Sequence, residues 1–195
     1  MDTFRPRYQI PFDDYEPALI EWDADEEIIH IPNDSFEDLM DYDDYDDQDD
    51  QHLHRRENFV DYDIILDHHI LKGQHGSLLA AAAGGLSFGT VGAIAGYWMG
   101  AKPDKKLCSR MSLVLFFTDG KRVERIDLIH PNAPVEYNSF QYDQKFDDLK
   151  ECICALEAFK LANSGREDVS QSELNDIATD IISKLNNLIM GEYDT

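Results

Sequence analysis

Seven carboxylates crowd into the ten residues from Asp41 to Asp50, and tyrosines occupy two of the other three positions. Such a segment, here called the acidic block, has two chemical uses. Clustered carboxylate oxygens hold a hard cation, or a row of negative charges imitates the phosphates of a nucleic acid. Burial of so many unpaired charges is prohibitive, so the block must face water or a strongly positive partner. The residue types therefore predict recognition rather than catalysis.

The spacing of the charges favours mimicry of a nucleic acid. Duplex DNA carries one charge for about every 1.7 Å of its axis, and side chains three or four residues apart on a helix lie about 5–6 Å from each other. Tyrosines between the acids add rigid contact area. The predicted partner-binding residues are Asp41, Tyr42, Asp43, Asp44, Tyr45, Asp46, Asp47, Asp49 and Asp50, with the nearby triplet Asp61, Tyr62 and Asp63. A solvated acidic linker is the other interpretation of the block.

Local motifs give little support to a metal site or an active site. The acidic block lacks the glycine at its sixth position and the distant glutamate of an EF-hand loop. His52 and His54 would suit zinc or iron together with the histidines at 68, 69 and 75, but His68 and His69 on a strand would point to opposite faces. The sequence contains no phosphate-binding loop, no nucleophile elbow and no zinc-protease motif. We expect no enzyme activity, no catalytic residue, no metal and no cofactor.

Negative charge is concentrated in the first third of the chain. The sequence has 40 acidic and 17 basic residues, for a net charge of −23. Residues 1–63 hold 22 acidic and 4 basic residues and contribute −18 of this charge. Such a charge disfavours nucleic acid or an anionic membrane as a direct ligand and favours a basic protein, a cation, or solubility alone. Of these we expect a basic protein, of the kind that binds nucleic acid, as partner. We divide the chain into an acidic interaction region, residues 1–63, and a scaffold, residues 64–195.

Cysteine usage and the first residues indicate the cytoplasm. Cys108, Cys152 and Cys154 form no Cys-x-x-Cys pair and are odd in number, which fits a reducing compartment better than a disulfide framework. On a helix Cys152 and Cys154 diverge by about 200°, so we expect small core residues rather than metal ligands. No apolar run of a secretory signal follows the N-terminal residues. A cytoplasmic location is expected.

The second unusual segment, residues 76–101, contains no charged side chain. Its glycines place small residues on one face of a helix, where another backbone can approach closely. The predicted zipper residues are Gly85, Gly89, Gly92, Gly96 and Gly100. Gly84-Gly85 is a natural turn, so the segment predicts either a hairpin of two short helices or one continuous helix, packed within the fold or between two copies of the chain. The rival interpretation is a membrane-associated accessory protein, because 26 uncharged residues exceed the roughly 20 that span a bilayer.

Local patterns predict several strands. Residues 18–22 and 27–31 can pair across a short turn, and residues 59–71 predict one strand rich in β-branched side chains. The apolar stretch over residues 111–129 is interrupted by Asp119-Gly120. An Asp-Gly pair between two β-rich runs is the strongest short hairpin signal, so we expect a hairpin here.

The C-terminal third predicts two helices. Apolar residues at helical spacing from Phe146 to Phe159 indicate a helix that stops at Gly165. Ser170 and Glu173 form a capping box for a last helix, which should pack on the sheet. The expected fold class is α+β, with a small antiparallel sheet, a glycine-rich helical hairpin and two C-terminal amphipathic helices. An acidic, partly ordered N-terminal region precedes them.

Residues 64–159 resemble glycine-zipper-plus-β-hairpin domains in uncharacterised proteins of Gram-positive bacteria and their phages. The resemblance rests on the glycines from Gly85 to Gly96 and on the runs 113–117 and 125–129. It implies no known activity and no catalytic residue. Together with the acidity it suggests, by analogy, a phage inhibitor that occupies the nucleic-acid-binding surface of a bacterial defence enzyme.

Overall fold

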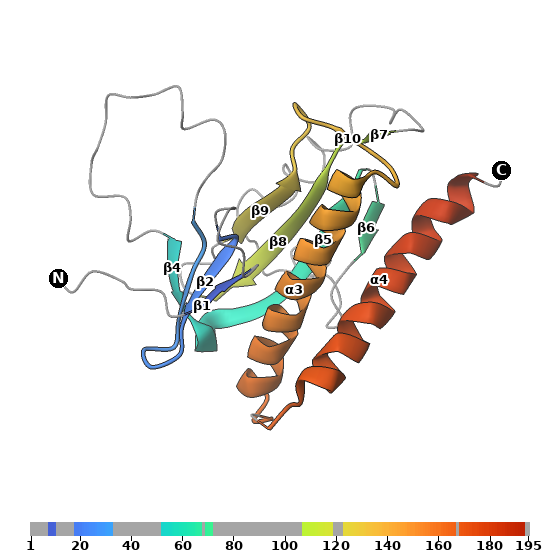
Figure 1. The fold of residues 1–195 in the computed structure, drawn as a ribbon. Coiled ribbons are helices and arrows are strands. Elements are labelled where there is room, and N and C mark those ends of the chain that lie inside the picture. The colour runs from blue at the N-terminus through green and yellow to red at the C-terminus, as the bar shows by residue number, and fades with distance from the viewer. Residues whose placement is uncertain are drawn as a thin grey trace, which may run out of the picture.

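The computed structural model describes residues 8–10, 18–32, 52–67, 69–71, 107–118, 123–166 and 168–193. The acidic block, the glycine-rich segment 76–101 and the turn at 119–120 lie outside these residues. The described residues form small antiparallel sheets and two long helices, so the predicted α+β class is confirmed. Helix α3 (Phe140–Asn163) crosses the strands, and helix α4 (Gln171–Tyr193) lies beside it (Figure 1).

The main sheet has the strand order β6-β5-β8-β9. Its strands are β5 (Phe59–Leu66), β6 (His69–Leu71), β8 (Met111–Phe117) and β9 (Val123–Ile129). The predicted hairpin over residues 111–129 is confirmed, because β8 and β9 pair antiparallel with Phe116 opposite Val123. Successive side chains of a strand point to opposite faces. Leu113, Leu115 and Phe117 accordingly join the main core, while Phe116 belongs to a smaller cluster with Ile65 and Val114.

The prediction of one strand over residues 59–71 is wrong, because the chain turns at Asp67. This residue has a φ of 50°, and β5 and β6 on either side of it pair antiparallel. The Asp67 carboxylate accepts hydrogen bonds from the backbone N–H and hydroxyl of Ser109 and from the backbone N–H of Arg110, at 2.7 to 3.1 Å. A distant segment thus fixes the turn. Local strand propensity cannot predict such a turn, because it depends only on neighbouring residues.

A second sheet at the N-terminal side has the order β1-β2-β3-β4. Its strands are β1 (Tyr8–Ile10), β2 (Ile20–Asp23), β3 (Ile28–His30) and β4 (Leu53–Arg55). Strands β2 and β3 pair antiparallel, which confirms the predicted pairing of residues 18–22 with 27–31. Ile20 and Ile29 are fully buried in the same core as Ile64 and Leu66 of the main sheet. The short helix η3 (Arg56–Asn58) links β4 to β5, and β7 (Leu107–Cys108) pairs with β10 (Val135–Glu136).

The two predicted helices are confirmed as α3 (Phe140–Asn163) and α4 (Gln171–Tyr193). Gly165 follows α3 with a φ of 85°, a left-handed conformation that glycine adopts without steric cost. Half of the predicted capping box forms, since the Ser170 hydroxyl accepts a hydrogen bond from the Glu173 N–H at 3.2 Å. The Glu173 carboxylate instead binds Arg166 at 2.8 Å.

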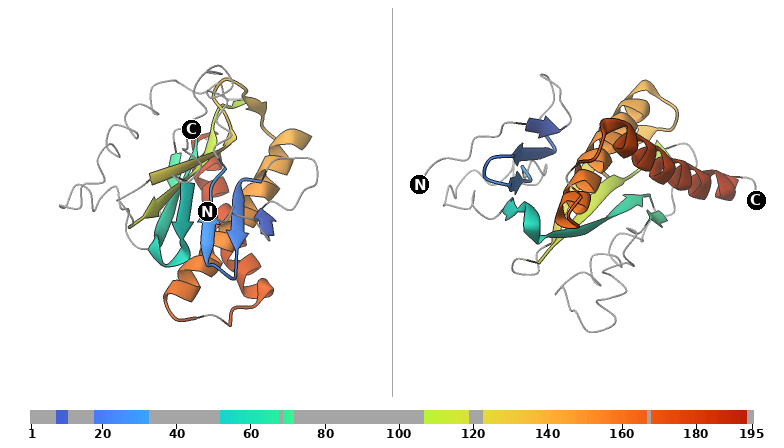
Figure 2. Two further views of the ribbon diagram at one scale, coloured as in Figure 1. Left: turned by 90° about the vertical axis from the view of Figure 1, so that its left-hand side faces the viewer. Right: turned by 90° about the horizontal axis from the view of Figure 1, so that it is seen from below.

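Helix α3 occupies the centre of the fold. Both helices lie on one side of the main sheet, and β1 and β2 lie on the side of α3 away from α4 (Figure 2). Buried residues on α3 therefore face several directions instead of one stripe, and they include Leu149, Cys152, Ile153 and Cys154. Helix α4 was expected on the sheet, but it packs mainly against α3 and reaches the sheet at β6. Helix α3 already covers the face that α4 would otherwise occupy.

In the part of the chain that the structure describes, no helix is both long and apolar enough to cross a bilayer.

An aromatic junction joins α3 to both sheets. The ring of Phe159 lies 4.8 Å from the ring of Trp22 in β2 and 6.3 Å from the ring of Phe59 in β5, measured between centroids. Aromatic pairs at these distances add to the stabilisation that comes from burial. The junction is therefore a main contact between the N-terminal sheet, the main sheet and α3.

We predict that Phe159→Ala lowers the free energy of unfolding by about 3–5 kcal/mol, because it removes a buried ring and leaves a cavity between three elements. Phe140→Ala on the same helix is the matched control. Phe140 is 82% exposed, so its removal should change stability by no more than about 0.5 kcal/mol. Urea unfolding followed by circular dichroism measures both. Equal stability of the two variants would contradict the packing described here.

Candidate binding surface

The structure separates the predicted partner-binding residues into two groups. Asp41 to Asp50 lie outside the described residues, so their role stays a prediction. Asp61, Tyr62 and Asp63 are buried, with 5%, 3% and 2% of their surface exposed. These three side chains are not displayed to a partner. The prediction that they belong to a surface patch is wrong. Asp61 is buried against a cation of α3, and Tyr62 is buried against a carboxylate of the same helix.

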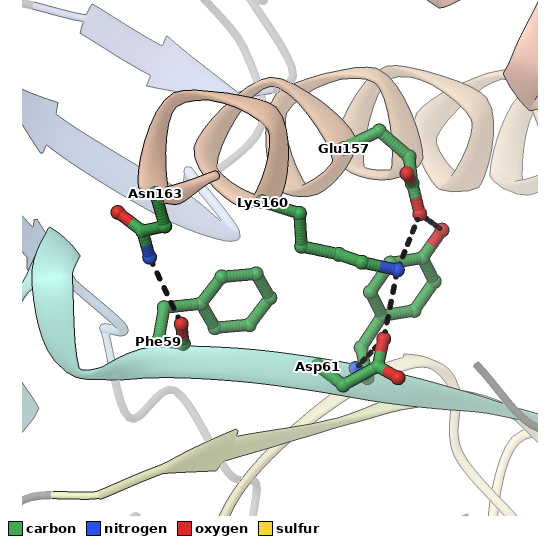
Figure 3. A network of polar contacts seen from close by, with 6 residues as sticks. Phe59, Asp61, Glu157, Lys160 and Asn163 are labelled. Atoms are coloured by element: carbon green, nitrogen blue, oxygen red, sulfur yellow. Dashed lines mark hydrogen bonds and ion pairs between the residues drawn. The ribbon is translucent and has the colours of Figure 1, made fainter. Parts of the chain in front are cut away.

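That cation is Lys160, whose Nζ lies 2.9 Å from Asp61 Oδ1 and 3.0 Å from Glu157 Oε1 (Figure 3). The Tyr62 hydroxyl donates a hydrogen bond of 2.8 Å to the same Glu157 oxygen. One turn further along α3, the Asn163 amide donates to the backbone carbonyl of Phe59 at 3.0 Å. These residues form a polar network that fixes α3 on β5.

An irregularity in β5 makes this network possible. Neighbouring residues of a regular strand point to opposite faces. The pairing of β5 with β8 shifts register between Phe59 and Asp61, and the backbone N–H of Tyr62 donates to Asp61 Oδ1 at 2.9 Å. The shift allows Asp61 and Tyr62 to reach α3 together.

Burial and charge alter the acidity of the network. Burial, the charge of Glu157 and the hydrogen bond to it raise the pKa of Tyr62 well above its ordinary value. Burial would lower the pKa of Lys160, but the hydrogen bonds and charges of Asp61 and Glu157 outweigh it and raise that pKa. Tyr62 is therefore neutral and Lys160 charged at physiological pH, which suits a structural anchor rather than a proton-transfer site.

The histidines near the acidic block also have structural partners. His52 Nδ1 and His54 Nε2 lie 3.1 and 3.0 Å from the two oxygens of Glu124 in β9. The His54 ring stacks on Phe117, with centroids 3.8 Å apart. Burial alone would raise the pKa of Glu124, but both histidines outweigh it and lower that pKa. The cluster therefore ties β4 to the β8–β9 hairpin.

The three cysteines are free thiols in the interior, which confirms the expectation that Cys152 and Cys154 are core residues. Burial and the charge of Asp67 raise the pKa of the Cys108 thiol to about 12, and burial likewise raises the pKa of Cys152. These thiols are protonated at neutral pH and are poor nucleophiles or metal ligands. Among the described side chains, no three histidines, cysteines or carboxylates are arranged to hold a metal ion.

Most of the basic side chains in the described part of the chain are paired with carboxylates. Six described lysines and arginines each lie within 3.2 Å of a carboxylate: Arg56 with Glu27, Arg125 with Asp127, Lys145 with Asp148, Lys160 with Asp61 and Glu157, Arg166 with Glu173, and Lys184 with Asp180. Each pair cancels an acid as well as a base, so the excess of 40 acidic over 17 basic residues remains on the other side chains. The surface therefore keeps the negative sign of the whole chain.

Part of this negative surface lies on α3. Asp143, Asp147 and Glu151 are exposed and stand four residues apart, so they form an acidic row along one side of the helix. We name these three residues the α3 acidic row. The helix predicted from Phe146 onward leaves out Asp143, so the sequence pattern does not predict this row.

No known family model matches this chain, and no curated protein or solved structure was found to be similar to it. The resemblance to glycine-zipper domains therefore stays a prediction.

We predict that Lys160→Met lowers the free energy of unfolding by about 3–5 kcal/mol, because it leaves two buried carboxylates without their cation. Lys184→Met is the control, since the Lys184–Asp180 pair is more than half exposed and such pairs contribute about 0–1 kcal/mol. Chemical denaturation measures the difference. A Lys160→Met protein as stable as the control variant would show that the network does not anchor α3.

The raised pKa values predict a loss of stability in alkali. Tyr62 and Lys160 keep their protons in the folded protein at pH values where the unfolded chain releases them, so unfolding is favoured as the pH rises above about 10. Their contribution should be constant between pH 7 and 9. Tyr62→Phe should make the alkaline decline shallower, whereas Tyr8→Phe, at a 58% exposed side chain, should not. Urea unfolding at a series of pH values tests this, and identical slopes for both variants would contradict it.

Proposed function

We propose that this protein is a non-catalytic acidic binding protein that occupies a basic surface, of the kind that binds nucleic acid, on another protein. The observation that carries the proposal is the use of positive charge. The chain has 40 acidic and 17 basic residues, and six of the described bases are already paired with carboxylates of the chain itself, some in the interior and some at the surface. The negative charge that remains favours encounter with a cationic protein.

The acidic block and the α3 acidic row are the proposed contact residues. Asp41, Asp43, Asp44, Asp46, Asp47, Asp49 and Asp50 supply the dense charge, with Tyr42 and Tyr45 as aromatic contacts. Asp143, Asp147 and Glu151 add carboxylates from a described helix. A row of ordered carboxylates competes with phosphates for the same lysines and arginines, so the protein would act as an inhibitor of nucleic-acid binding.

The proposed site of action is a reducing compartment such as the cytoplasm. All three cysteines of the chain are free and buried, so the fold does not depend on a disulfide.

We predict that changing Asp43, Asp44, Asp46 and Asp47 to Asn weakens binding of a basic, DNA-binding partner by about tenfold or more, because four charges are lost while shape is kept. The partner is first isolated from a bacterial lysate on the immobilised protein. It should be released by raised salt and by duplex DNA. Affinity is then measured against salt concentration.

A second four-charge variant serves as control: Asp25→Asn, Glu26→Gln, Asp168→Asn and Asp176→Asn remove exposed charges elsewhere. It should retain most of the affinity. If the acidic-block variant binds with unchanged affinity and salt dependence, or if duplex DNA does not displace the partner, the proposed function is wrong.

A further inference from the structure

A groove of about 830 Å³ lies over α3, between β1 and β2 on one side and the first turns of α4 on the other. Its floor is α3, where Cys154, Ala155 and Ala158 are small and leave room above the helix. Trp22 and Phe159 of the aromatic junction form the apolar end. A volume of this size lies in the range of about 300–1,000 Å³ that is typical of ligand sites and holds a few side chains.

Contacts beneath the groove hold its walls in place. The Cys154 thiol donates to the backbone carbonyl of Leu174 at 3.7 Å and to Asn175 Oδ1 at 3.5 Å, which ties the floor to α4. The rings of Trp22 and Phe159 lie 4.8 Å apart and tie β2 to α3. The groove is therefore built from elements fixed by the core, and a ligand would not have to order them.

The rim of the groove has the chemistry to receive a cation. Asp147 and Glu151 of the α3 acidic row line it, and Asp143 lies one turn beyond. Lys150 also lines it, so the two carboxylates exceed the one base. Tyr8, 58% exposed, presents an aromatic ring at the edge strand β1, where a ring face can attract a guanidinium or ammonium group.

We infer that this groove binds a basic segment of the partner protein in which an apolar side chain stands beside arginine or lysine. The apolar side chain lies over Ala155 and Ala158, against Trp22, and the basic residues face Asp147, Glu151 and Tyr8. Burial of an apolar side chain on the apolar floor stabilises the complex, and the acidic rim favours a segment whose neighbouring residues are positively charged. The inference rests on the proposed function and adds to it a specific anchoring site that charge mimicry alone does not supply.

The test uses the full chain and two acetylated hexapeptides, Arg-Arg-Trp-Leu-Arg-Arg and its control Arg-Arg-Ser-Ser-Arg-Arg. Binding is followed by two-dimensional NMR of the protein amides. The first peptide should shift the amides of Ala155, Ala158 and Leu174 in a saturable way, and the control should bind about tenfold more weakly because it lacks the apolar anchor. Equal binding of the two peptides, or shifts confined to other parts of the protein, would overturn the inference.

Variants of exposed groove residues provide the second arm, because their removal should leave the fold intact. Tyr8→Ala and the pair Asp147→Asn with Glu151→Gln should each weaken the first peptide severalfold. The pair Asp25→Asn with Glu26→Gln, which removes the same charge outside the groove, should not. Wild-type affinity of the groove variants would overturn the inference.

The acidic-block variant separates this inference from the proposed function. Asn at positions 43, 44, 46 and 47 should leave hexapeptide binding in the groove intact while it weakens the whole basic partner. If the acidic-block variant loses the partner but the groove does not bind the hexapeptide, the inferred groove site is wrong and the proposed function stands. If the groove binds the hexapeptide but the partner binds the acidic-block variant with unchanged affinity, the proposed function is wrong and the groove site stands.

Discussion

The pairing of Lys160 with Asp61 and Glu157 is the interaction on which the arrangement of α3 depends. Helix α3 contacts β1 of the N-terminal sheet, β5 and β9 of the main sheet, β10 and α4, so its position relates both sheets to the second helix. Apolar packing alone permits a helix to slide or rotate on a sheet. A buried cation between one carboxylate of the helix and one of the strand permits far less movement, because displacement would leave charge uncompensated in the interior.

Because acids outnumber bases, few carboxylates can be paired with a base, and each buried pair matters for the stability of the fold. A chain with 40 acidic and 17 basic residues cannot neutralise every carboxylate. The bases that stand in the core or between elements, such as Lys160 and Arg56, stabilise the fold. Carboxylates for which no base remains are tolerable where water or a partner screens them. The same shortage of bases therefore leaves an excess of carboxylates for the surface.

Elements encoded by local pattern were predicted well from the sequence. The β8–β9 hairpin follows from two β-rich runs on either side of Asp119-Gly120, and α3 and α4 follow from helical spacing, Gly165 and Ser170. Features set by distant partners were missed. Asp61, Tyr62 and Asp63 have a surface composition, yet Tyr62 is held by Glu157, 95 residues away. The turn at Asp67 depends on Ser109, 42 residues away. A local pattern contains no record of such partners.

The same reasoning explains why the groove was not anticipated. In the sequence, the floor residues Cys154, Ala155 and Ala158 look like ordinary buried residues of a helix. The wall at β1 comes from a strand more than 130 residues earlier in the chain. Small residues that face a packed neighbour allow close approach, but over this floor the neighbours stand apart and the space stays open. At this groove, small residues face open space instead of a closely packed neighbour.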